Sequence, residues 1–207
     1  MCGQLKVCWL AISLMQPSAA LSNDMGEHPY AEPVPSYLRQ FSEDGGKVFV
    51  LERFDAEGRL VDRSIERVSG EITITGAVER SVAGYDIQLR GLSGCPSETV
   101  MYNRMQTWKC IDAVRDYAGA IYNKRARVIL CKTMVLSRAQ GQVIPASCFS
   151  LVGGDGDGEP YRTANDDDSM VFLGLAEIGK TPDGRSRRPD LEHVQSLSKT
   201  RDFRNAD

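Results

Sequence analysis

Four cysteines are the residues whose type and spacing most directly predict chemistry beyond the first twenty positions: Cys95, Cys110, Cys131 and Cys148. Cysteines at such spacing either bind zinc or form disulfides. None of the four belongs to a C-x-x-C pair, and His193 lies far along the chain, so a zinc site is disfavoured. An even number of cysteines favours two disulfides, and three pairings remain open from the spacing.

Acidic residues offer two further candidates for metal binding. The alternating run Asp155–Glu159 resembles the start of an EF-hand calcium loop, but Pro160 stands where that loop needs glycine and no helix pair flanks it. We therefore expect an acidic surface turn. The run Asp166–Asp168 precedes an apolar stretch and predicts a helix cap rather than a metal cluster. His28 and His193 are isolated, and we expect both to be surface residues.

The first twenty residues have the pattern of a secretory signal peptide. Lys6 supplies a positive charge, Val7–Met15 is apolar, and Ser18–Ala20 offers small residues for cleavage. An apolar run of about nine residues is far shorter than the ~20 that span a bilayer. We expect cleavage after Ala20, a mature chain without a membrane span, and a periplasmic or secreted destination in which disulfides are stable.

Length and composition predict one folded domain rather than two. The chain has 207 residues, 42% of them hydrophobic and 26% charged, which is typical of a globular protein. Removal of residues 1–20 leaves 24 basic and 28 acidic residues, a net charge of −4. A mildly acidic chain argues against a dedicated nucleic-acid binder. A local basic patch of Lys124, Arg125, Arg127 and Lys132 keeps nucleic acid among the candidate partners.

The remaining sequence predicts an N-terminal extension, a β-rich domain and a polar tail. We expect residues 22–36 to be irregular because they are rich in proline. Residues 47–54 and 59–61 flank a Gly-containing turn and predict a hairpin within the extension, 21–64. Period-two alternation from residue 65 predicts strands, and spacing by threes and fours predicts a helix over 105–122.

Two more strands and a tail complete the prediction. Residues 126–131 and 143–152 have strand character on either side of a polar turn at 137–141. The final segment, 181–207, is rich in Arg and Asp, so we expect a solvated tail with a short helix over 190–197.

The order of these segments resembles the staphylococcal nuclease family. The segments that carry the resemblance are 68–74 (VSGEITI), 87–96 (IQLRGLSGCP), 106–110 (QTWKC), 128–131 (VILC), 146–148 (ASC) and 170–176 (MVFLGLA). The resemblance implies a β-rich α+β fold: an OB-type five-stranded barrel over 65–180 with two or three helices. It also implies the disulfides Cys131–Cys148 and Cys95–Cys110.

Members of this family cleave phosphodiesters with calcium-binding carboxylates, a further carboxylate beside the attacking water, and two arginines. The resemblance places Glu71 at one calcium position and Ser93, a much weaker ligand, at another. It places Glu98 near the water-orienting position, displaced by one extra residue. Both arginine positions hold glutamine, Gln88 and Gln142, which carries no charge.

The sequence therefore predicts a family member with a degenerate catalytic site, and it leaves catalysis itself open. Rhizobial gene clusters for succinoglycan, an acidic exopolysaccharide, encode a small exported protein of this family, and the signal, size and layout here are similar to it. One alternative is a calcium-dependent exported nuclease that uses Glu71, Arg90 and Glu98, with Arg90 replacing the lost charge and calcium as its cofactor. A second alternative is an OB-type module that binds oligosaccharide or nucleic acid.

Overall fold

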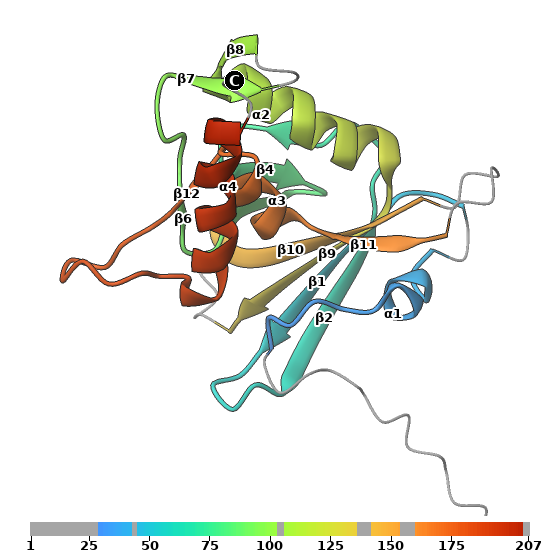
Figure 1. The fold of residues 1–207 in the computed structure, drawn as a ribbon. Helices are drawn as coiled ribbons and strands as arrows, with labels where there is room; N and C mark the ends of the chain where they lie inside the picture. The colour runs from blue at the N-terminus through green and yellow to red at the C-terminus, as the bar shows by residue number, and fades with distance from the viewer. Residues whose placement is uncertain (1–28, 43–44, 103–105, 136–141, 154–159, 205–207) are drawn as a thin grey trace, which may run out of the picture.

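A computed structural model describes residues 29–42, 45–102, 106–135, 142–153 and 160–204. The expected signal peptide, His28, the polar turn at 137–141 and the acidic run 155–159 lie outside these residues. Within them the protein is a β-rich α+β structure with a large mixed sheet and helices packed on it (Figure 1). These residues form four α-helices and two disulfides.

The large sheet contains eight strands in the described residues. They are β1 (Val48–Phe54), β2 (Leu60–Arg67), β3 (Thr73–Ile74), β4 (Glu79–Val82), β5 (Tyr85–Leu89), β9 (Ala126–Met134), β10 (Ile144–Val152) and β11 (Arg162–Asn165). Their order is β2-β1-β9-β10-β5-β4-β3, and β11 pairs with the second half of β10. The pairs β1–β9 and β5–β10 are parallel, and the other pairs are antiparallel.

The five strands expected in the barrel are consecutive neighbours in the sheet, in the order β9-β10-β5-β4-β3. A closed barrel is not shown, because β3 and β2 end the sheet on opposite sides and do not pair with each other in the described residues. The outer edge of β9 is paired with β1 instead. The N-terminal hairpin thus extends the sheet at the place where closure would occur.

The hairpin forms where the sequence predicts it. Asp55 opens the turn, and its Oδ1 accepts hydrogen bonds from the backbone N–H groups of Glu57 and Arg59. Gly58 has φ +79°, a conformation that glycine adopts without steric cost. Because β1 then lies between β2 and β9, residues 48–67 are an integral part of the sheet.

The helices are α1 (Pro35–Arg39), α2 (Cys110–Gly119), α3 (Asp166–Phe172) and α4 (Glu192–Arg204), and a π-helical segment (Ala120–Arg125) continues α2. Two short antiparallel pairs accompany them: β7 (Thr99–Tyr102) with β8 (Gln106–Lys109), which are close in the chain, and β6 (Leu92–Ser93) with β12 (Glu177–Ile178), which are distant in the chain. The predicted helix starts too early, because residues 106–109 pair with β7. No helix in the described part of the chain is long and apolar enough to cross a membrane.

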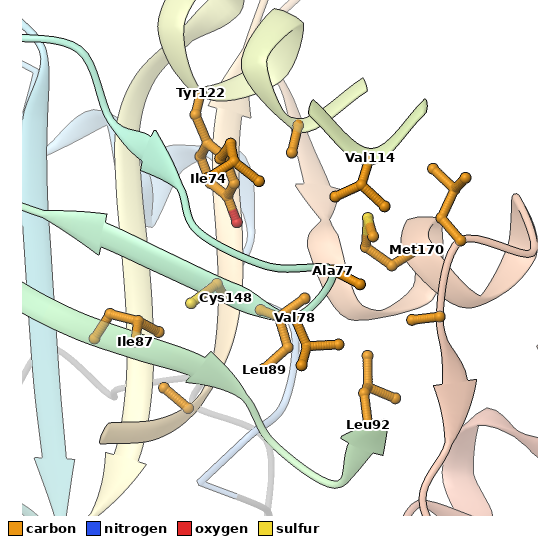
Figure 2. Close-up of a cluster of buried hydrophobic side chains, with 14 of the residues drawn as sticks. Ile74, Ala77, Val78, Ile87, Leu89, Leu92, Val114, Tyr122, Cys148 and Met170 are labelled. Atoms are coloured by element: carbon orange, nitrogen blue, oxygen red, sulfur yellow. The ribbon is translucent and has the colours of Figure 1, made fainter. Parts of the chain in front are cut away.

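The inner face of the sheet packs against α2, α3 and the segment after α3. Its apolar side chains include Ile87 and Leu89 of β5, Val114 of α2 and Met170 of α3, which converge in Figure 2. The disulfide Cys131–Cys148 joins β9 to β10 within this core, and Cys95–Cys110 ties the start of α2 to the preceding loop. Both pairings are those that the family resemblance implies.

The opposite, outer face of the sheet has an apolar half and a polar half. Leu38 of α1 covers the apolar half, where Val50, Val128, Leu130 and Leu151 are fully buried. The polar half lies toward the other end of β1 and β9, where Glu52 and Lys132 are buried. Residues 29–41, which we call the N-terminal arm, run over both halves.

The C-terminal segment differs from the solvated tail that its composition predicts. Arg188 and Leu191 are buried, and a short 3-10 helix (Pro189–Leu191) leads into α4. α4 packs on α3, and it is longer than the expected helix over 190–197. The composition misleads here because the charge of Arg188 is balanced by two carboxylates, Asp167 and Asp190.

Candidate functional site

The structure separates the two carboxylates that the sequence assigns to catalysis. Glu71 is exposed beside Ile72, whose backbone N–H donates to Oδ1 of Asn123 beyond the C-terminus of α2 (2.8 Å). Glu98 is exposed at the other end of α2, where its carbonyl oxygen accepts from the Cys110 N–H (2.9 Å). With a helical rise of ~1.5 Å per residue, these positions are about 20 Å apart. One phosphodiester group cannot contact both.

The other predicted site residues are also distributed. Gln88 lies on β5, half-buried between Glu79 of β4 and Pro145 of β10. Ser93 is exposed on β6, and its hydroxyl donates to the Glu177 carbonyl oxygen (3.3 Å). Gln142 is exposed just before β10. In the described residues, no group of three or more His, Cys, Asp or Glu side chains is placed to hold a metal ion. Glu71, the calcium candidate, therefore belongs to no such group.

The four residues of the candidate basic patch do not form one exposed surface. Lys124 and Arg125 are exposed in the π-helical segment, whereas Lys132 is only 2% exposed inside the sheet. Successive side chains of a strand point to opposite faces of the sheet. Because Cys131 faces the inner core, the next residue, Lys132, points to the outer face.

What the structure does bring together is a line of polar residues across the outer face. Register pairs Arg63 of β2 with Glu52 of β1, Glu52 with Lys132 of β9, and Lys132 with Ser147 of β10. Arg90 follows Leu89, which lies opposite Ala146, and the Arg90 N–H donates to the Ala146 carbonyl (2.8 Å), so Arg90 is level with Ser147. We call these five residues the polar row.

The N-terminal arm covers the polar row along its length. The Tyr30 ring lies 3.8 Å from the guanidinium carbon of Arg90, and the Ala31 carbonyl accepts a hydrogen bond from Lys132 Nζ (2.7 Å). At the far end the Tyr37 hydroxyl donates to Glu52 Oε1 and accepts from Arg63 Nη2 (2.6 Å). The arm therefore supplies the row with an aromatic face, a carbonyl and a hydroxyl.

The charges at the Glu52 end are matched. Arg63 Nη2 lies 2.8 Å from Glu52 Oε1, and the Glu52 side chain is fully buried. Burial lowers the pKa of Lys132 and the Glu52 carboxylate partly offsets this. Burial raises the pKa of Tyr37, and its hydrogen bond to Glu52 raises it further. Glu52 is thus held by a cation and a hydroxyl, while Lys132 has one carbonyl acceptor.

Arg188 stabilises the Arg90 end from the C-terminal segment. Its Nη1 donates to the Arg90 carbonyl (3.0 Å) and to Asp167 Oδ2 (2.5 Å), and its Nη2 donates to Asp190 (2.8 Å). Gly91 permits this approach, since a Cβ there would lie 2.8 Å from Cγ of Arg188. Burial lowers the pKa of Arg90, and the positive charge of Arg188 lowers it further.

Asp166 and Asp167 point in different directions from the start of α3. The helix begins at the acidic run as predicted, but its cap is Asn165, which accepts from the Asp168 N–H, and the three aspartates form the first turn. Asp167 faces Arg188, whereas Asp166 accepts from the Tyr122 hydroxyl (2.8 Å) and from Ser150 (3.2 Å). Burial raises the pKa of Asp166 to about 7 despite these hydrogen bonds.

A small cavity adjoins this inner cluster. It is lined by Arg80, Tyr122 and the Cys131–Cys148 disulfide among others, and it has room for about one water molecule. Arg80 is buried with Nε and Nη2 unpartnered, while its Nη1 donates to three backbone carbonyls. The cavity is too small for an organic ligand.

Several polar atoms at the polar row make no hydrogen bond although they are buried. They are Glu52 Oε2, Arg90 Nε and Ser147 Oγ, with Asp167 Oδ1 beside them. The Ser147 hydroxyl lies close enough to Asp167 to lower its pKa but makes no hydrogen bond of normal geometry. Buried polar groups are normally partnered, and unpartnered groups mark sites of function or of bound solvent. The polar row is therefore the candidate functional site.

Sequence reasoning named two residues of this row, Arg90 as a catalytic candidate and Lys132 as part of a basic patch, and it did not connect them. The signals for the row itself were weak: Glu52, Lys132 and Ser147 are single polar residues inside apolar strand segments, where a buried polar side chain breaks the expected pattern. Arg63 has the ordinary appearance of an exposed strand residue. Only the parallel pairing of β1 with β9 places these residues side by side.

Comparison of the chain with family models, with curated proteins and with solved structures gives no match.

Proposed function

We propose that the protein is an exported, nuclease-like binding protein that does not cleave phosphodiesters and that takes part in exopolysaccharide production. The observation that carries the non-catalytic assignment is the separation of Glu71 and Glu98 to opposite ends of α2, with Arg90 stacked on Tyr30 instead of near either. The glutamines at both arginine positions agree with it.

Two features support the nuclease-like, OB-type assignment. The strands that the resemblance assigns to the barrel are adjacent in the sheet, and α2 lies between β5 and β9 in the chain as that layout requires. Both disulfide pairings also follow the resemblance. The exopolysaccharide role comes from the resemblance alone, and fold likeness by itself does not fix a function.

Export is supported by the disulfides. Two disulfides in one small domain are typical of proteins that fold in an oxidising compartment. Together with the signal pattern of residues 1–20, they favour a periplasmic or secreted protein.

Phosphodiester hydrolysis by the purified, oxidised protein tests the non-catalytic assignment. We expect no cleavage of single-stranded DNA above background with calcium or with a chelator, and no difference between the native protein and the Glu71→Ala variant. Calcium-stimulated cleavage that Glu71→Ala abolishes would instead establish an active nuclease. Deletion of the gene in its native host, with exopolysaccharide yield as the readout, tests the biological role.

A further inference from the structure

We propose that Arg90, Ser147 and Lys132 form a binding site for a single carboxylate group of an acidic sugar, and that Tyr30 and Ala31 of the N-terminal arm are its displaceable cover. The choice of an acidic sugar rests on the proposed function, whereas the carboxylate site itself rests only on the polar row.

The donors of this site have unused hydrogen-bonding capacity. The Nε of Arg90 is buried and has no hydrogen-bond partner in the described residues. Lys132 Nζ carries three N–H donors and gives one of them to Ala31. Ser147 is 1% exposed, and its hydroxyl lies near Asp167 without making a hydrogen bond of normal geometry. A carboxylate accepts up to four hydrogen bonds and would satisfy all three residues.

The register places the donors at a suitable spacing. Arg90 and Lys132 lie on either side of Ser147 in the row, two strand spacings apart, or about 10 Å between backbones. The long side chains of arginine and lysine can converge over Ser147 from these positions. A carboxylate above Ser147 would then receive charge-assisted hydrogen bonds from both, which are stronger than neutral ones.

The surrounding charges favour one negative charge over several. Arg63 is paired with Glu52, and Arg188 is paired with Asp167 and Asp190. Asp168 lies near Arg188 and near Glu32, and these two carboxylates add negative charge at that end. The site therefore has no large positive excess, and a phosphate dianion or a polyphosphate backbone would meet repulsion that a lone carboxylate largely avoids.

The arm contacts the site as a weak internal ligand would. The guanidinium carbon of Arg90 lies over the Tyr30 ring, its Nε has no hydrogen-bond partner in the described residues, and the Ala31 carbonyl is a neutral acceptor for a cation. A neutral acceptor binds an ammonium more weakly than a carboxylate does. A carboxylate ligand that replaces the Ala31 carbonyl therefore binds Lys132 more strongly than the carbonyl does. Removal of the Tyr30 ring, which lies over Arg90, should make this replacement easier.

The experiment is a titration of the oxidised protein with glucuronate, followed through the Arg Nε–H and backbone amide signals by NMR. We expect a saturable shift of the Arg90 Nε–H signal with glucuronate and none with glucose. Arg90→Gln should weaken binding about tenfold or more. Arg115→Gln, a matched change on the exposed side of α2, should leave binding unchanged, and Tyr30→Ala should tighten it several-fold.

Three results would overturn the proposal. The first is no saturable shift in either the native protein or the Tyr30→Ala variant, both shown to be folded by their amide dispersion. The second is an equal loss of binding in Arg90→Gln and Arg115→Gln, which would mean non-specific screening. The third is tighter binding of inorganic phosphate than of glucuronate.

A competition arm tests the sugar class. Oligoglucuronate should displace glucuronate at lower concentration than a poly-glutamate peptide or single-stranded DNA does, and the reverse order would overturn the assignment to a sugar. Hydrolysis of DNA is measured separately, so an active nuclease and a failed carboxylate site are distinguishable outcomes.

Discussion

The two faces of the central sheet bury their side chains by different means. The inner face is closed by α2 and α3 with apolar side chains and the Cys131–Cys148 disulfide. The outer face is closed by the N-terminal arm, which covers an apolar half with Leu38 and a polar half with Tyr30 and Tyr37. In the described residues, four of the six unpartnered buried side-chain atoms lie at or beside the polar half, and the other two belong to Arg80 of the inner cluster.

This contrast separates stability from function. Apolar burial contributes about 25 cal/mol per Å² and needs no partner, so the inner face stabilises the fold directly. Buried ions contribute little net stability, because desolvation offsets their attraction. A row of buried ions with spare hydrogen-bonding capacity is therefore better explained by ligand binding than by stability. Four experiments test this contrast between the inner face and the polar row.

The largest effect is expected from the inner face. Phe49→Ala removes a fully buried ring that packs 5.5 Å from the Tyr85 ring, and it should lower the free energy of unfolding by about 3–5 kcal/mol. Chemical denaturation measures this. Val61→Ala on exposed β2 is the control and should cost less than about 0.5 kcal/mol. Equal losses would contradict the placement of the stabilising core.

A somewhat smaller loss is expected when the disulfide of the inner face is removed. Cys131 and Cys148 are separated by 17 positions, and closing a loop of that size stabilises a fold by about 3 kcal/mol. The double variant Cys131→Ala/Cys148→Ala should lose about that amount in urea denaturation. Retention of full stability would show that the bond is not a structural part of the core.

The inner face also carries one strongly shifted carboxyl group, which predicts a pH dependence. Because the folded pKa of Asp166 is about 7, above its unfolded value of 3.8, the folded state holds the proton more tightly. Its contribution is fully present below pH 3.8 and is lost as the pH rises toward 7, by about 1.4 kcal/mol for each pH unit. Unfolding measured at pH 5, 6 and 7 should show this slope, and Asp166→Asn should lack it.

The smallest effect is expected in the polar row. Lys132→Met keeps most of the length of the side chain while removing a buried charge, and Glu52 retains Arg63 and Tyr37 as partners. We expect a change within about 1 kcal/mol in either direction. Glucuronate binding should nevertheless weaken. A loss of several kcal/mol would assign Lys132 to stability and remove the contrast between the two faces.

Local patterns explain what could be predicted. The β1–β2 hairpin follows from alternation on either side of Asp55 and Gly58, and the Asx cap of α3 follows from Asn165 and the acidic run. The start of α2 was missed because residues 106–109 pair with β7, a contact that periodicity does not report. The ion pairs of Arg188 could not be predicted, because a segment rich in charged residues is expected to be solvated unless its partners are known.

The sequence by itself determined the β-rich class, the hairpin, the two disulfide-forming pairs through its resemblance, and the two glutamines that weaken a nuclease reading. Only the tertiary structure decided that Glu71 and Glu98 lie apart and that Arg90, Ser147 and Lys132 lie in one line. The reason is physical: side-chain alternation fixes which face a residue occupies, but strand order and register decide its neighbours, and both depend on contacts between distant segments.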